Sequence, residues 1–124
     1  MLSEAALRRI DREVAKYPPD QKQSAVMAAL AIVQMERGWL SNEIIEAVAN
    51  HLGMAPMAVY EVASFYNMYD LAPVGKYKIT VCTNLPCALS GGVHAADYLK
   101  QKLGVGFNET TADGKYTLKE GECM

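Results

Sequence analysis

The strongest constraint on the fold is a change of hydrophobic pattern near Pro73-Val74-Gly75. Before this point apolar residues recur at helical spacing, as they do along amphipathic helices. After it, residues 76–81 alternate polar and apolar side chains, which is typical of a strand with one buried face. The sequence therefore predicts an α+β chain with a helical bundle at residues 1–72 and a second, smaller domain at residues 73–124.

Four helices are expected in the first part, and four short helices in a row indicate a small bundle. The second is expected over residues 21–37, with Asp20 as its N-cap in a capping-box exchange with Gln23. The other expected ends come from residues that start or stop helices: Pro18-Pro19 after the first, Gly38 after the second, Ser41 and Gly53 around the third, and Pro56 in the first turn of the fourth.

The second part predicts a small α/β unit. A strand is expected at residues 76–81, followed by a loop, a helix at residues 89–103 closed by Gly104, a turn at Asp113-Gly114 and a strand at residues 115–119. Gly91 and Gly92, directly after the loop, allow close approach of another backbone segment or of a partner. These elements form one continuous strand–loop–helix–strand unit.

Composition and charge exclude several classes of protein. Hydrophobic residues make up 51% of the chain, enough for a real core, and the formal charge of −2 offers no basic surface for nucleic acid. No run reaches the roughly 18 apolar residues that a membrane span requires. The N-terminus lacks the pattern of a secretory signal. We therefore expect a cytoplasmic protein without a membrane span, in a compartment that keeps thiols reduced.

All three cysteines lie in the second part, and four residues separate Cys82 from Cys87. A loop of this length, between a strand and a helix, lets two thiolates converge on one inorganic centre. The spacing alone leaves three interpretations open: an iron–sulfur cluster, a zinc site, or ordinary thiols without metal. His51 and His94 are not spaced as metal ligands. His51 is expected at the surface or as a helix C-cap, and a solvated helix face is favoured for His94 over a supporting role beside a metal site.

The segment from Cys82 to Gly92, Cys-Thr-Asn-Leu-Pro-Cys-Ala-Leu-Ser-Gly-Gly, resembles the cluster loop of the 24-kDa [2Fe–2S] subunit of NADH:quinone oxidoreductase, respiratory complex I. Gly38-Trp39, the segment Ala-Ser-Phe-Tyr at residues 63–66 and the segment Pro-Val-Gly-Lys at residues 73–76 also resemble that family. The resemblance covers nearly the whole chain. It implies that the second part is a thioredoxin-like ferredoxin domain.

The resemblance also implies a ligand set. The family holds its [2Fe–2S] cluster with four cysteines, and Cys82, Cys87 and Cys123 match the first three. The sequence ends at Met124, before a match to the fourth. We therefore expect a ferredoxin domain that is truncated at its C-terminus, in which a cluster with three cysteine ligands is labile.

The role implied by the family is electron transfer inside a larger enzyme. A partner flavoprotein subunit binds NADH and FMN, and this chain, in the peripheral arm of a membrane-bound complex, carries the cluster without a catalytic site of its own. No glycine-rich dinucleotide fingerprint and no Cys-x-x-Cys pair is present, which agrees with this role. The alternatives are the equivalent subunit of an NAD-linked hydrogenase or formate dehydrogenase, and a zinc-stabilised or metal-free interaction domain.

A docking surface is a further expectation for the helical part. Phe65, Tyr66, Met68 and Tyr69 follow one another closely, in a bundle too small to bury much aromatic surface. For Phe65 itself, burial in the core is the favoured interpretation.

Overall fold

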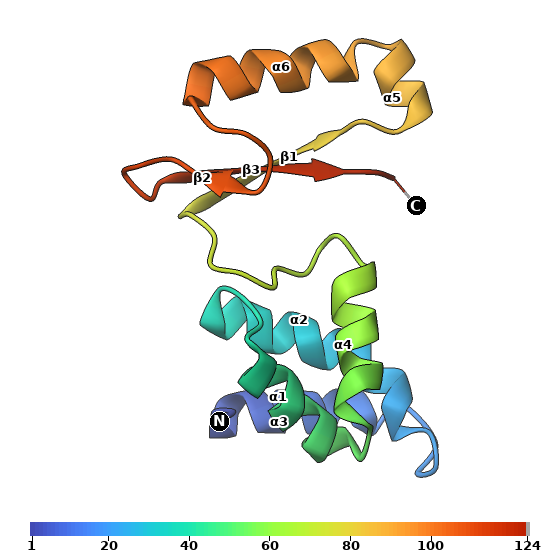
Figure 1. Cartoon of the computed structure of the whole chain (residues 1–124). Helices are drawn as coiled ribbons and strands as arrows, with labels where there is room; N and C mark the ends of the chain where they lie inside the picture. The colour runs from blue at the N-terminus through green and yellow to red at the C-terminus, as the bar shows by residue number, and fades with distance from the viewer. Residues whose placement is uncertain (124) are drawn as a thin grey trace. The chain divides into compact units, whose positions relative to one another are not determined.

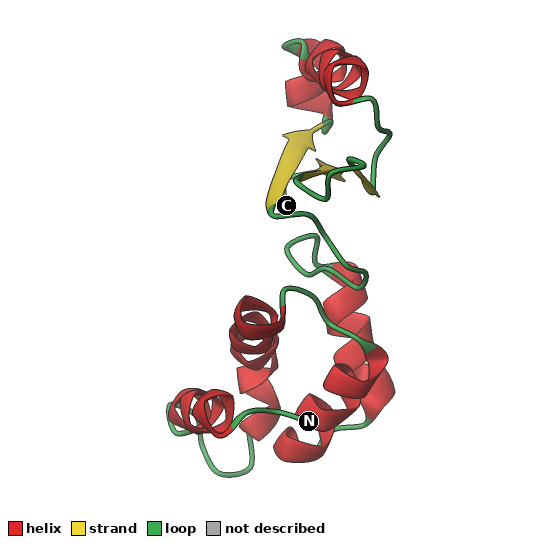
Figure 2. Cartoon of the chain, turned by 90° about the vertical axis from the view of Figure 1, so that its left-hand side faces the viewer, coloured by secondary structure: helices red, strands yellow, loops and turns green. Residues whose placement is uncertain are grey.

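The computed structural model describes residues 1–123, which form two compact units, residues 1–73 and the residues from Val74 onward. The first unit is helical, and the second combines strands and helices (Figure 1). Figure 2 shows the same division by secondary structure. The pattern change near Pro73 therefore coincides with the boundary between the units.

The first unit contains four α-helices and a short 3₁₀ turn. They are α1 (Glu4–Val14), η1 (Lys22–Ala25), α2 (Val26–Arg37), α3 (Asn42–Leu52) and α4 (Pro56–Phe65). Three of the expected ends are confirmed. Ser41 accepts a hydrogen bond from the Ile44 backbone N–H at 3.3 Å, and Gly38 and Gly53 end α2 and α3 with φ of 87° and 68°.

The expected capping box at Asp20 is wrong. The segment before α2 is the 3₁₀ turn η1, which follows Gln21, and no side chain caps it. The α-helix then begins at Val26 instead of Gln21. Tight 3₁₀ turns are common at the N-termini of α-helices, and here the turn supplies the entry into α2 that a capping box would otherwise provide.

The core of the first unit is formed by apolar side chains from all four helices. Its largest fully buried members are Ile10, Leu30, Leu40, Val48 and Val59. After α4 the chain returns to α2, where the Tyr69 hydroxyl donates to the Met27 carbonyl at 2.8 Å. Burial raises the pKa of Tyr69, so this phenol remains a hydrogen-bond donor.

The aromatic segment after α4 divides between core and surface. Tyr69 is buried, whereas Phe65 is 69% exposed and Met68 is also exposed. The rings of Phe65 and Tyr66 meet edge to face with centroids 5.0 Å apart. Core burial of Phe65 was therefore the wrong prediction, because this residue lies at the C-terminal end of α4, where the helix leaves the core.

The second unit is a three-stranded sheet with helices on one face. Its elements are β1 (Tyr77–Cys82), α5 (Leu85–Leu89), α6 (Gly92–Leu103), β2 (Glu109–Thr110) and β3 (Tyr116–Gly121). The strand order is β1-β3-β2, in which β3 is parallel to β1 and antiparallel to β2. Helix α6 runs along the sheet (Figure 1) and packs against β1 and β3. Leu118, in the central strand, is fully buried.

Two features of this unit differ from the sequence prediction. The helix expected from Leu89 begins only at Gly92, after Gly91 turns the chain with φ of 98°, and the loop expected before it contains the short helix α5, which ends at Leu89. Strand β2, only two residues long, was not predicted; it pairs with β3 across the expected turn at Asp113-Gly114. The helix end at Gly104 is confirmed, with φ of 68°.

The helices of residues 1–123 offer no candidate for a membrane span, since none combines the necessary length with sufficient hydropathy.

Candidate metal centre

Parallel pairing of β1 and β3 brings two cysteines together. Cys82 is the last residue of β1 and pairs with Gly121, the last residue of β3, so Cys123 follows only two residues later. Because parallel strands point the same way, the two strands end at the same edge of the sheet. The sulfur atoms of Cys82 and Cys123 are 3.9 Å apart, although the two residues lie 41 positions apart in the sequence.

Cys87 is the third cysteine near this edge of the sheet, and it lies on the helix that follows β1. It lies in the middle of the short helix α5, and its side chain hydrogen-bonds with that of Cys82. All three cysteines are free thiols that are at least partly accessible. The expected convergence of Cys82 and Cys87, with Cys123 on the same side, is therefore confirmed as geometry.

The thiols differ in acidity. The backbone N–H groups of Asn84 and Cys123, followed by the Cys87 side chain, donate hydrogen bonds to the Cys82 sulfur and hold the pKa of Cys82 below its usual value. The pKa of Cys87 is raised, first by the hydrogen bond between its side chain and Cys82 and then by the negative charge of the Cys82 thiolate. Cys82 is therefore expected to ionise before Cys87, and the thiolate is the form that binds metal.

Hydrogen bonds fix the cysteine loop to the end of β3. The Thr83 backbone N–H donates to the Gly121 carbonyl at 3.1 Å, and the Thr83 hydroxyl donates to the Glu120 carboxylate at 2.9 Å. The Asn84 side chain donates to the Cys123 carbonyl oxygen and to its sulfur, both at 3.3 Å. In the sequence, the position of Asn84 just before a helix indicates an N-cap, but nothing local indicates the contact with Cys123.

Gly92 allows the start of α6 to lie directly against this loop. A Cβ atom at Gly92 would stand 2.7 Å from the Cys82 carbonyl oxygen and 2.9 Å from that of Cys87. Both distances are shorter than side-chain carbons tolerate, and both atoms belong to the backbone. The expected close approach of backbone is thus confirmed at Gly92. The backbone that approaches it belongs to Cys82 and Cys87, two of the candidate ligands.

The donor set suits thiolate coordination of a metal. Two thiolates bound tetrahedrally to one metal at about 2.3 Å lie about 3.8 Å apart, which agrees with the 3.9 Å between Cys82 and Cys123. Within residues 1–123, no three His, Cys, Asp or Glu side chains are arranged around a point that a single metal ion would occupy. A two-iron cluster does not require such a point, because it divides its ligands between two metals.

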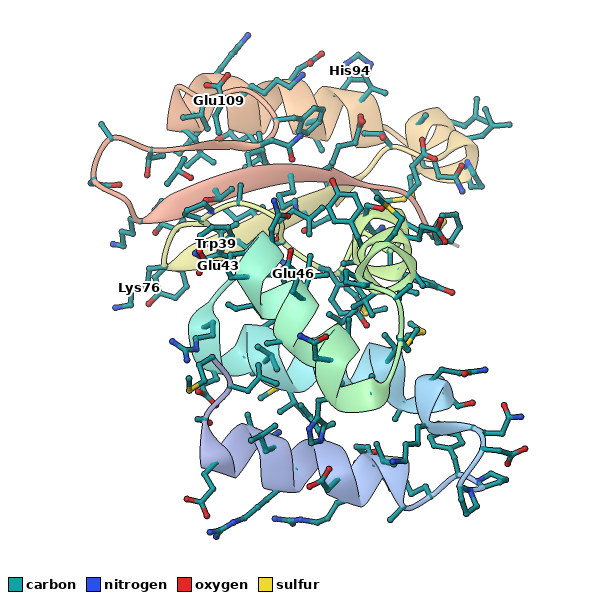
Figure 3. All side chains as sticks on the ribbon, turned by 60° about the horizontal axis from the view of Figure 1, so that its bottom comes forward. Trp39, Glu43, Glu46, Lys76, His94 and Glu109 are labelled. Carbon is teal, nitrogen blue, oxygen red and sulfur yellow. The ribbon has the colours of Figure 1, made fainter. Side chains whose placement is uncertain are left out.

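The histidines lie elsewhere. His51, near the end of α3, contacts the Asp11 carboxylate of α1 at 2.7 Å, so it joins two helices of the first unit. His94 is exposed on α6 and points away from the sheet (Figure 3). The prediction that His94 is a surface residue is confirmed. His51 is half-buried, because its ring contacts Asp11.

Comparison with known proteins identifies the family. The family described as thioredoxin-like [2Fe–2S] ferredoxin matches residues 10–124. The chain belongs to this family. It is 42% identical over 115 residues to NADH-quinone oxidoreductase subunit 2 of Thermus thermophilus, and 47% identical over 112 residues to an NADH-quinone oxidoreductase subunit of Rickettsia typhi. The resemblance to the 24-kDa subunit family is therefore confirmed.

The chain spans just under two-thirds of the length of these ferredoxin-family relatives. The matches cover 93% and 90% of this chain but 64% of the Thermus protein and 66% of the Rickettsia protein. Among solved structures, an NAD⁺-reducing [NiFe]-hydrogenase in its H₂-reduced state matches with a TM-score of 0.57 at 19% identity, over 76% of this chain and 16% of that chain. At this identity the structural match concerns the fold alone.

Proposed function

We propose that this thioredoxin-like ferredoxin is the electron-transfer subunit of an NADH:quinone oxidoreductase. The gathering of Cys82, Cys87 and Cys123 at one edge of the sheet is the single observation that carries the proposal. The identity of 42–47% to subunits of that enzyme supports it. The hydrogenase likeness concerns the fold, so the equivalent subunit of an NAD-linked hydrogenase is the less favoured candidate.

The three cysteines are the proposed ligands of a [2Fe–2S] cluster, which takes up and passes on one electron at a time when bound. An all-cysteine site of this type needs four ligands, so the proposal assigns the fourth to a group outside the described residues. Cys82, with its lowered pKa, supplies one thiolate ligand. The Thr83 hydrogen bonds keep the loop against β3, which holds Cys82 and Cys123 at a fixed separation.

The chain's role in the whole enzyme is to hold and tune the cluster. In this proposal residues 1–72 form a helical bundle domain and residues 73–124 form the ferredoxin domain. A flavoprotein partner binds NADH and FMN, and the chain belongs to the peripheral arm of the complex. No independent catalytic site is assigned to it. The potential of a cluster depends on burial, charge and hydrogen bonds to the sulfurs, all of which are properties of this chain.

Anaerobic reconstitution tests the proposal. The chain is incubated with ferric iron, which is the oxidation state of both irons in the oxidised cluster, together with sulfide and an excess of 2-mercaptoethanol, which serves as the exogenous fourth ligand. Visible absorption and about two irons per chain are expected, together with an electron paramagnetic resonance signal after one-electron reduction. Cys82→Ala is expected to lose most of the iron, whereas Ser90→Ala, on the exposed turn after α5, retains it. A colourless wild-type chain, or full iron in Cys82→Ala, would contradict the proposal.

The parent enzyme is tested separately. The chain carrying an affinity tag is recovered from its own cells under mild detergent conditions, and the co-purified subunits are identified by mass spectrometry. A flavoprotein together with quinone-reducing subunits supports NADH:quinone oxidoreductase. Recovery with hydrogenase or formate dehydrogenase subunits would assign the chain to those enzymes instead.

A further inference from the structure

Asn84 connects the two halves of the metal centre. Its Oδ1 atom accepts a hydrogen bond from the Leu85 backbone N–H at 3.0 Å, which caps α5. Its Nδ2 atom donates to the carbonyl oxygen and the sulfur of Cys123, each at 3.3 Å. Asn84 and Cys123 are 39 residues apart in the sequence, so this contact exists only in the folded unit.

The surroundings fix which way the amide faces. The Leu85 backbone N–H can only donate, so the amide oxygen must lie on its side. The amide nitrogen is then turned toward Cys123, where a carbonyl oxygen and a sulfur both accept. Its two hydrogens match these two acceptors. The orientation therefore follows from the hydrogen-bond network.

We propose that Asn84 is a positioning residue that raises the reduction potential of the cluster through its hydrogen bond to the Cys123 sulfur. The inference rests on the proposed cluster function and adds to it. Reduction adds one electron to the cluster and breaks no bond. A donor held against a ligand sulfur stabilises the more negative, reduced state more than the oxidised one. Loss of the donor therefore lowers the potential.

Serine and alanine variants separate this role from helix capping. Asn84→Ser retains a good N-cap and adds no charge, but its short hydroxyl cannot cap α5 and also reach Cys123. Asn84→Ala removes both the cap and the donor. If the donor matters, both variants have a lowered potential; if Asn84 is only a cap, Asn84→Ser behaves like the wild type. Asn50→Ser, an exposed substitution of the same kind on α3, is the matched control.

The experiment is a mediated redox titration of the reconstituted chain, again with 2-mercaptoethanol as the fourth ligand. Iron content and visible absorption are measured first, before any potential. We expect Asn84→Ser and Asn84→Ala to reduce the equilibrium constant for reduction by roughly threefold to tenfold, which is at most about 59 mV for a one-electron couple. Asn50→Ser keeps the wild-type potential.

A measurement on the wild-type chain tests the inference even if the variants do not take up the cluster. The chain is prepared with asparagine labelled with ¹⁵N only in the side-chain amide, and the reduced cluster is studied by pulsed electron paramagnetic resonance. A ¹⁵N coupling to the cluster is expected from Asn84, and its absence would overturn the inference. A wild-type potential in Asn84→Ser would overturn it too, with the cluster intact. A wild-type chain that takes up no cluster would instead overturn the proposed function, and the inference with it.

Discussion

Gly92→Ala is expected to destabilise the second unit and loosen the metal centre. The new Cβ would stand 2.7 Å from the Cys82 carbonyl oxygen. Carbon–oxygen contacts normally lie at about 3.3 Å or more, so the loop or α6 must move by roughly 0.6 Å. Overpacking of this kind typically costs about 1–3 kcal/mol. The obstructing atoms are backbone, which cannot rotate away as a side chain would.

A smaller effect opposes this cost. Replacing glycine by alanine restricts the unfolded chain and favours helix, which contributes up to about 1 kcal/mol of stability. Because Gly92 is the first residue of α6, the helix contribution falls short of its full value. The clash therefore outweighs it, and we expect a net loss of about 1–2 kcal/mol in the free energy of unfolding.

Urea unfolding followed by far-ultraviolet circular dichroism measures this loss. Gly106→Ala is the matched control, because a Cβ there meets only the end of the flexible Glu109 side chain, at 3.1 Å. Gly92→Ala is also expected to hold less iron after reconstitution than Gly106→Ala, since it displaces the backbone of Cys82 and Cys87. Equal stability and equal iron content in the two variants would refute the reasoning.

Three further predictions concern the thiols, the core of the second unit and the helix cap at Ser41. Below the ordinary thiol pKa of about 8.5, iodoacetamide should label Cys82 before Cys87 in the metal-free chain, because the pKa of Cys82 is lowered and that of Cys87 is raised. Peptide mapping of the labelled chain at several pH values measures this, and equal labelling of the two cysteines would contradict it. Leu118→Ala should remove about 2–5 kcal/mol of stability in urea unfolding, because this side chain is fully buried in the central strand. A loss below about 1 kcal/mol would contradict that assignment. Ser41→Ala should remove about 1 kcal/mol and Ser41→Asn nearly none, since asparagine also caps; equal losses would argue against the cap.

Local signals predicted much of the fold. Ser41, Gly38 and Gly53 mark helix ends because capping depends on one residue and the few backbone groups next to it. Asp20 has the same signal, yet the chain enters α2 through a 3₁₀ turn, which a capping pattern does not distinguish from the first turn of an α-helix. Strand β2 escaped prediction because two residues show no alternation.

The metal centre was less accessible to sequence reasoning. Spacing brought Cys82 and Cys87 together, but left cluster, zinc and free thiols open. Cys123 was predicted as a ligand only through the family resemblance. Its closeness to Cys82 depends on the parallel pairing of β1 with β3, which are distant in the sequence. The contact of Asn84 with Cys123 is non-local in the same way. Such contacts depend on tertiary packing, of which a single sequence carries little trace.

The 41-residue separation between Cys82 and Cys123 has a consequence for folding itself. A cofactor bound to both sulfurs, as proposed, would act as a covalent cross-link that closes this loop and restricts the unfolded ensemble for as long as it stays bound there. By the chain-entropy relation used for disulfides, closing a loop of this length stabilises the native state by about 4 kcal/mol. In the proposed holoprotein, cofactor insertion and completion of the β1–β3 pairing are thus thermodynamically linked, and we expect conditions that strip the iron to weaken the sheet as well.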